Sequence, residues 1–189
     1  MQTGYSKLDS NAGREANVIV VMGTYTSTSF FNYDDESSYA SRYRKNATIT
    51  GIYGGVDYEA RLYFYGGSGS YRYINGDTTM QYMELYGNRD QMYLYLQGYS
   101  FTMGEGITMV NYATSNRNQG LLGSRAPAFH MICGWCQYNR TNLPRNNPEI
   151  LIKSGTYGRI IGGGSPGTSS GQGQTTSNCL LYTSPSPRD

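Results

Sequence analysis

The side chains of this chain that best suit acid–base catalysis are four carboxylates: Asp57, Glu59, Asp77 and Glu84. Asp57 and Glu59 are two positions apart, so both would point the same way on a β-strand, where side chains alternate between faces. Hydrolysis of a glycosidic bond uses two carboxyl groups about 5–10 Å apart. Asp77 lies in an Asn-Gly-Asp sequence, where the turn alone favours aspartate. These residues are the candidates for polysaccharide chemistry, although no aspartate cluster for calcium and no paired basic residue accompanies them.

The motif Cys133-Gly134-Trp135-Cys136 could be a redox pair if the first cysteine began a helix after a strand, but the residues that follow form a poor helix. A zinc site would need a fourth ligand beyond these cysteines and the single histidine, His130. We therefore interpret Cys133 and Cys136 as structural, either as a buried thiol or as a local disulfide. Without a nucleophile elbow, Ser-His-Asp catalysis has no support. We predict no catalytic residue, no metal site and no cofactor.

Tyrosines are unusually frequent, at 20 of 189 residues, and some alternate with aliphatic residues or Phe. Period-two spacing places such tyrosines on one face of a strand and the apolar residues on the other. Outward tyrosines could form a flat platform for sugar rings or a partner protein. We favour instead a stacked ladder whose cross-strand pairs contribute about 0.2–1 kcal/mol each, since repeated coils align like residues. The candidates for this aromatic ligand-binding platform are Tyr63, Tyr65, Tyr93 and Tyr95.

Composition limits the partners and the location. The net charge is +2 and only 15% of residues are charged, so capture of nucleic acid or of an acidic membrane surface is not supported. No apolar run is long enough for a transmembrane helix, and the first residues do not resemble a signal peptide. Neutral polar residues provide the solubility, which is common in exported proteins. We expect a secreted or cell-surface protein whose true start lies upstream.

Short strands must position these residues. Runs of about four to six β-prone residues end repeatedly at Gly or Asn-Gly, and no helical period persists. This pattern predicts an all-β fold. The clearest runs are Asn17–Met22, Ala47–Thr50, Arg61–Tyr65, Tyr71–Ile74, Thr79–Tyr86, Gln91–Leu96, Tyr99–Met103, Ile107–Tyr112, Phe129–Cys133, Glu149–Lys153 and Gly158–Ile161.

Three phrases of the sequence carry a family resemblance: residues 17–26 with 47–51, residues 76–87, and residues 150–164. The chain resembles the pectate-lyase-like right-handed parallel β-helices of bacterial surface proteins. The resemblance implies a truncated right-handed parallel β-helix, a solenoid in which inward Val, Ile, Leu and Met stack on one another. It implies a surface setting and carries no catalytic signature.

The expected organisation has a polar lead-in, a stack of coils with loop excursions, and a Gly/Ser-rich linker. The last 11 residues, which include Cys179, resemble one reading frame of a transposon-based sequencing adapter, so we exclude them from the fold. The corresponding ranges are 1–15, 16–161 with excursions 24–45, 113–127 and 137–148, 162–178, and 179–189.

We expect a non-catalytic structural or binding scaffold of an adhesin-like bacterial protein, with a glycan or a surface protein as its partner. One alternative is a fragment of a polysaccharide lyase or hydrolase of the β-helix class. Another is a carbohydrate-binding β-sandwich, which would show antiparallel strands where stacked coils show parallel ones.

Overall fold

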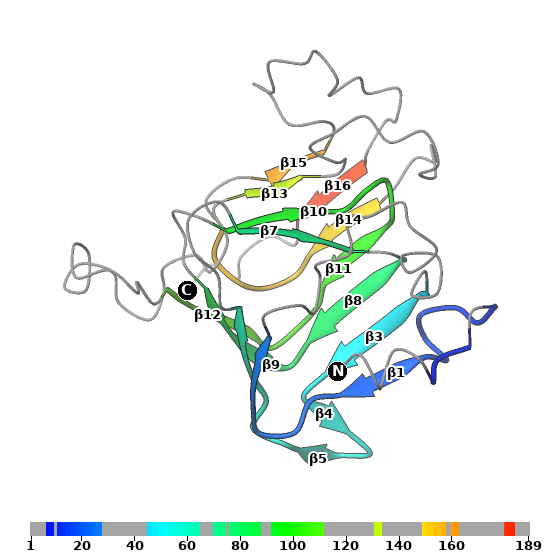
Figure 1. Cartoon of the computed structure of the whole chain (residues 1–189), viewed down its shortest axis with the longest axis vertical. Helices are drawn as coiled ribbons and strands as arrows, with labels where there is room; N and C mark the ends of the chain where they lie inside the picture. Colours follow the sequence, from blue (N-terminus) through cyan, green and yellow to red (C-terminus); the bar gives the residue numbers. More distant parts are fainter. Residues whose placement is uncertain are drawn as a thin grey trace.

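The computed structural model of this chain is built from β-strands, and its described part contains no helix (Figure 1). The structure describes residues 7–9, 11–27, 45–64, 70–74, 76–87, 92–111, 131–133, 149–157, 160–162 and 180–183. The strands are β1 (Val18–Val20), β2 (Thr24–Ser27), β3 (Ala47–Thr50), β4 (Ile52–Tyr53), β5 (Val56–Asp57), β6 (Arg61–Phe64), β7 (Ser70–Tyr73), β8 (Thr78–Gln81), β9 (Met83–Gly87), β10 (Met92–Tyr95), β11 (Phe101–Met103), β12 (Ile107–Asn111), β13 (Met131–Cys133), β14 (Glu149–Ile152), β15 (Ile160–Ile161) and β16 (Leu180–Thr183).

The strands form three parallel sheets and one small antiparallel hairpin, β4–β5. Sheet A has the order β1-β3-β8-β11-β14-β16, sheet B the order β12-β9-β6-β2, and sheet C the order β15-β13-β10-β7. From β6 the chain visits sheets B, C and A in β6, β7 and β8, and repeats that order in β9 to β11 and again in β12 to β14. We call each such passage a round. The strand content confirms the all-β prediction, and the pairing within the three larger sheets is parallel, unlike the antiparallel pairing expected of a β-sandwich.

One hydrophobic core lies between the three sheets. Side chains alternate strictly in β9, where Met83 and Leu85 are buried and Glu84 and Tyr86 are partly exposed. Burying each large aliphatic side chain contributes about 1.5–3 kcal/mol. The largest fully buried side chains come from strands of all three sheets or their ends: Ile49, Leu62, Ile74, Met80, Leu85, Leu94, Leu96, Phe101 and Met103.

A ladder of polar side chains stabilises the corner that leads into sheet A. The Asn46 Oδ1 accepts the Asp77 N–H at 2.9 Å, and the Asp77 Oδ1 accepts the Ser100 N–H at 2.8 Å. The Ser100 Oγ accepts the Glu149 N–H at 3.1 Å. Each side chain therefore satisfies a backbone donor in the next round. The bond from the Ser100 N–H to the Asp77 Oδ1 gives Asp77 a structural role at this corner, in agreement with its interpretation as a turn residue.

The corner between sheets A and B uses a left-handed backbone. Glu59, Tyr82 and Gly106 have φ angles of 49°, 53° and 66°. Glu59, Tyr82 and Gly106 each lie two residues before a set of register partners on β6, β9 and β12. These partners are Arg61, Glu84 and Thr108, respectively. A left-handed residue other than glycine costs about 1–2 kcal/mol. The hairpin β4–β5 is inserted at this corner, just before Glu59 (Figure 1).

Two expected segment boundaries differ from the structure. The excursion 24–45 was expected to begin at Thr24, but Thr24–Ser27 is strand β2, paired with β6. The excluded segment 179–189 contributes β16, which pairs in parallel with β14. Both results have one cause: backbone hydrogen bonds at a sheet edge accept any extended, β-prone sequence, so polar or unrelated side chains do not prevent pairing. Of the excursions 113–127 and 137–148 and the linker 162–178, only residue 162 is described.

Candidate functional site

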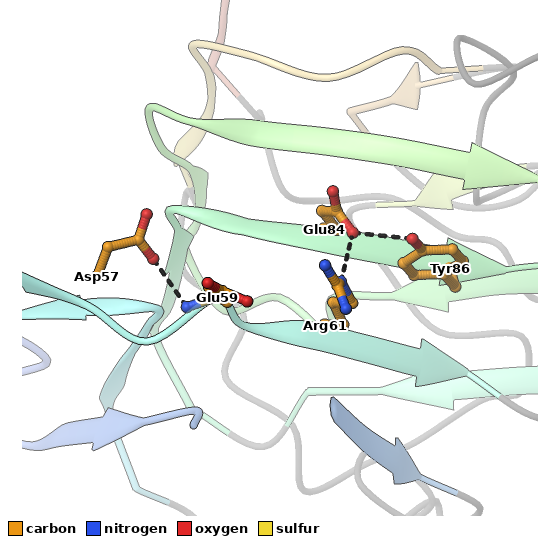
Figure 2. Close-up of polar contacts among 5 residues, drawn as sticks. All are labelled: Asp57, Glu59, Arg61, Glu84 and Tyr86. Carbon is orange, nitrogen blue, oxygen red and sulfur yellow. Dashed lines mark hydrogen bonds and ion pairs between the residues drawn. The ribbon is translucent and has the colours of Figure 1, made fainter. Parts of the chain in front are cut away.

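A groove of about 350 Å³ lies where the sheet A to sheet B corner meets the outer face of sheet B. Its floor comes from the first residues of β6, β9 and β12, and its rim comes from the hairpin end and the left-handed corner residues. Figure 2 shows its charged side chains around these strands. We call it the sheet B groove. It is lined by Ile52, Asp57, Glu59, Ala60, Arg61, Tyr82, Met83, Glu84, Gly106 and Thr108.

Arg61, Glu84 and Tyr86 form a hydrogen-bonded network beside the groove (Figure 2). Arg61 and Glu84 are direct partners in the parallel register of β6 and β9. The Arg61 Nε donates to the Glu84 Oε2 at 3.1 Å, and the Tyr86 hydroxyl donates to the same oxygen at 2.8 Å. The two charged side chains are 46% and 41% exposed, so they remain accessible to a ligand. The hydrogen bond with Glu84, together with partial burial, raises the pKa of Tyr86 to about 12, which keeps its hydroxyl protonated.

Tyr63 and Tyr86 stack face to face on the outer side of sheet B. Their ring centroids are 4.2 Å apart and the rings are within 10° of parallel. The two residues are register partners on β6 and β9. Because each ring covers one face of the other, the pair forms the ladder that the sequence allowed, rather than a flat two-ring platform. A ligand here would contact ring edges, hydroxyls and the neighbouring charged groups.

Asp57 and Glu59 both line the sheet B groove, but they do not share a strand face as expected. Strand β5 ends at Asp57, and Glu59 follows in the left-handed corner. The Asp57 Oδ1 accepts the Glu59 N–H at 2.9 Å, which closes a local turn that Asp favours (Figure 2). Both residues are exposed. The turn, and not strand alternation, brings the two carboxylates to one groove together with Glu84.

Tyr82 lines the groove from the corner and was not singled out from the sequence. Its hydroxyl donates to the Glu105 Oε2 at 3.3 Å, and the negative charge of Glu105 raises the pKa of Tyr82. Arg61 was missed as well. Only the register of β6 against β9 brings Arg61 beside Glu84, and the spacing of 23 residues in the sequence carries no such signal.

The four tyrosines proposed as one surface belong to different sheets. Tyr63 is on β6 of sheet B, and Tyr93 and Tyr95 are on β10 of sheet C. Tyr95 exposes 2% of its surface, so its expected outward placement is wrong. Leu94 and Leu96, which flank Tyr95, are fully buried as well, so strand alternation does not separate a buried from an exposed side here. Tyr65 lies outside the described residues.

The cysteine motif is only partly placed. Cys133 is the last residue of β13, which agrees with a cysteine at a strand end. Cys136 and His130 lie outside the described residues, so the local disulfide remains a prediction.

A second groove, of about 460 Å³, lies on the outer face of sheet A. Thr48, Thr79 and Thr102 are register partners on β3, β8 and β11 and form part of its floor. Arg14 crosses this face and donates to the Thr102 Oγ1 at 3.3 Å. Its lining mixes these threonines with apolar residues such as Val18 and with charges of both signs, whereas the sheet B groove gathers carboxylates.

Within the part of the chain that the structure describes, no group of three or more His, Cys, Asp or Glu is arranged to hold a metal ion. Among the same residues, none belongs to a helix with the length and apolarity needed to cross a membrane. A scan against protein-family models and searches of curated proteins and of solved structures found no match to this chain.

Proposed function

We propose that this chain is a non-catalytic scaffold of a secreted or cell-surface, adhesin-like bacterial protein, and that it binds a glycan in the sheet B groove. We further propose that its rounds wind as a right-handed parallel β-helix. The repeated B, C, A order of the strands supports winding. We propose right-handed winding because connections between parallel strands of one sheet are strongly biased towards the right-handed form.

The single observation that carries the binding proposal is the Arg61–Glu84–Tyr86 network, whose two charged residues line the groove. A sugar presents neighbouring hydroxyls that both donate and accept hydrogen bonds. The Glu84 carboxylate accepts from such a pair, and the Arg61 guanidinium, with five N–H groups in a planar fork, donates to it. The parallel register of β6 and β9 places both side chains next to each other, and their hydrogen bond orients them before a ligand binds.

Binding is favoured over hydrolysis because of the surroundings of the carboxylates. A glycosidase needs one carboxyl group that stays protonated, usually in an apolar environment. Glu84 instead faces a guanidinium and a hydroxyl donor, and Asp57 and Glu59 are exposed to solvent. None of the three has the surroundings of a general acid.

The test is a printed panel of neutral, amino and acidic oligosaccharides, followed by calorimetry with the tightest ligand. Glu84→Gln should weaken binding by at least about tenfold, because a hydrogen bond to a charged group contributes about 1.5–3 kcal/mol. Thr79→Val, on the face of sheet A, is the matched control and should bind like the parent. Absence of binding to every glycan, or equal loss in both variants at unchanged melting temperature, would refute the proposal.

A fragment of a polysaccharide lyase or hydrolase remains the second candidate, because three carboxylates line one groove. Turnover of a polysaccharide that Asp57→Asn, Glu59→Gln or Glu84→Gln abolishes, while Asp77→Asn changes only stability, would favour the enzyme over the scaffold. The scaffold proposal predicts no turnover by the parent chain.

A further inference from the structure

The sheet B groove is unbalanced in charge. Among the described residues that line it, three are carboxylates, Asp57, Glu59 and Glu84, and one, Arg61, is a guanidinium. That guanidinium is already bonded to Glu84 at 3.1 Å. Glu105 lies next to the groove, because it accepts a hydrogen bond from the hydroxyl of the lining residue Tyr82, and its side chain is 65% exposed. Its cationic neighbour, Lys153, is 3.8 Å away. The described lining of the groove therefore presents net negative charge to a ligand.

Resting on the proposed glycan binding, we infer that the ligand is an amino sugar with a free, protonated amine. An ionised carboxylate only accepts hydrogen bonds, and an ammonium group only donates them, with three N–H bonds. A protonated amine can therefore donate several hydrogen bonds to these carboxylates, whereas a hydroxyl can donate only one. The Asp57 carboxylate has one oxygen engaged with the Glu59 N–H, and its charge stays at the groove mouth.

The same charges select against the other common classes of sugar. An N-acetylated sugar keeps the ring and its hydroxyls but loses the positive charge and two of the donors. A uronic acid places a carboxylate against carboxylates. Exposed ion pairs contribute up to about fivefold in affinity each, which is about 1 kcal/mol. With Asp57 and Glu59 both engaged, the preference for the amine over its acetylated form is about 2- to 25-fold.

The experiment compares three tetrasaccharides by calorimetry with the full chain: β-1,4-linked glucosamine, its N-acetylated counterpart, and galacturonate. The measurements use a pH at which the amine is protonated, in low salt and again in about 1 M salt, where the Debye length is about 3 Å. The double variant Asp57→Asn/Glu59→Gln removes two charges from the groove. The double variant Glu15→Gln/Glu149→Gln removes the same number of charges elsewhere and is the control.

The inference predicts that glucosamine binds tightest and galacturonate weakest. High salt and the groove variant should both remove the preference, and the control variant should keep it. Equal binding of glucosamine and its acetylated form would overturn the amine inference while leaving glycan binding intact, as would a preference lost equally in both double variants. Tighter binding of galacturonate would overturn it as well. Failure of all three sugars and of the printed panel would refute the proposed function itself.

Discussion

Gly76 occupies a corner between β7 and β8 where the neighbouring round leaves no room for a side chain. A Cβ at this position would lie 2.3 Å from the Lys45 carbonyl oxygen and 2.9 Å from the Asn46 nitrogen. Real Cβ contacts are essentially never shorter than 3.0 Å, so Gly76→Ala must separate the two backbones by about 0.7 Å. The adjacent bonds from the Asp77 N–H to Asn46 Oδ1 and from the Ala47 N–H to the Asp77 carbonyl, both 2.9 Å, hold the rounds together there.

Gly76→Ala should lower the free energy of unfolding by about 2–4 kcal/mol. Overpacking a close contact costs about 1–3 kcal/mol, and weakening one backbone hydrogen bond adds about 1 kcal/mol. Two matched glycines separate this effect from others. At Gly13 an added Cβ meets nothing within 4 Å, so Gly13→Ala should be neutral or stabilise by about 0.4–1 kcal/mol. At Gly23 the space is also open but φ is +63°, so Gly23→Ala should cost about 1 kcal/mol of backbone strain.

The assay is urea denaturation followed by circular dichroism, with linear extrapolation to water. The free energy of unfolding should decrease in the order Gly13→Ala, Gly23→Ala, Gly76→Ala. If Gly76→Ala is as stable as Gly13→Ala, the rounds are not packed backbone to backbone at this corner, and the reasoning fails.

Three further outcomes follow from the packing and the sheet B network. Leu85→Ala should lower the free energy of unfolding by about 2–5 kcal/mol, since its fully buried side chain leaves a cavity; a loss below about 1 kcal/mol in the same urea assay would contradict its core position. Glu84→Gln should lower the pKa of Tyr86 from about 12 toward 10, measured by ultraviolet titration, and an unchanged titration would disprove the hydrogen bond. In the parent, the raised pKa of Tyr86 stabilises the fold below about pH 10, and this stabilisation should disappear as the pH rises from about 10 to 12. A double-mutant cycle on Arg61 and Glu84 should give a coupling of about 0.2–1 kcal/mol that decreases with salt, whereas a salt-independent coupling would argue against an exposed ion pair.

Each expected run overlaps a strand, but the single run Thr79–Tyr86 is two strands of different sheets, β8 and β9, separated by the left-handed Tyr82, and the outward side expected for Tyr95 was wrong. Met83 and Leu85 in β9, and Thr78 and Met80 in β8, occupy the buried positions that period two requires. Such local patterns are set by the strand itself, so they can be read without knowing its neighbours.

The site depended on information that local patterns do not hold. Arg61 meets Glu84 because of the register between β6 and β9, and Tyr95 is buried although it alternates with the buried Leu94 and Leu96. Glu59 and Tyr82 adopt a left-handed conformation that their residue types do not favour, so only the repeated corner explains it. The register between distant strands and the burial of individual outer residues could therefore not be predicted from local sequence patterns.

Parallel pairing of successive rounds is the claim on which the site depends, and disulfide trapping tests it most directly. Thr48 and Thr79 are register partners on adjacent strands of sheet A, and Thr102 is one strand further. Neighbouring strands lie about 4.8 Å apart, within the range of about 4.4–6.8 Å that a disulfide spans between Cα atoms, and alternate strands lie about 9.6 Å apart. In a chain whose native cysteines are replaced by serine, Thr48→Cys/Thr79→Cys should oxidise to an intramolecular disulfide, and Thr48→Cys/Thr102→Cys should stay reduced. Equal oxidation of the two pairs, or oxidation of the distant pair alone, would contradict the structure.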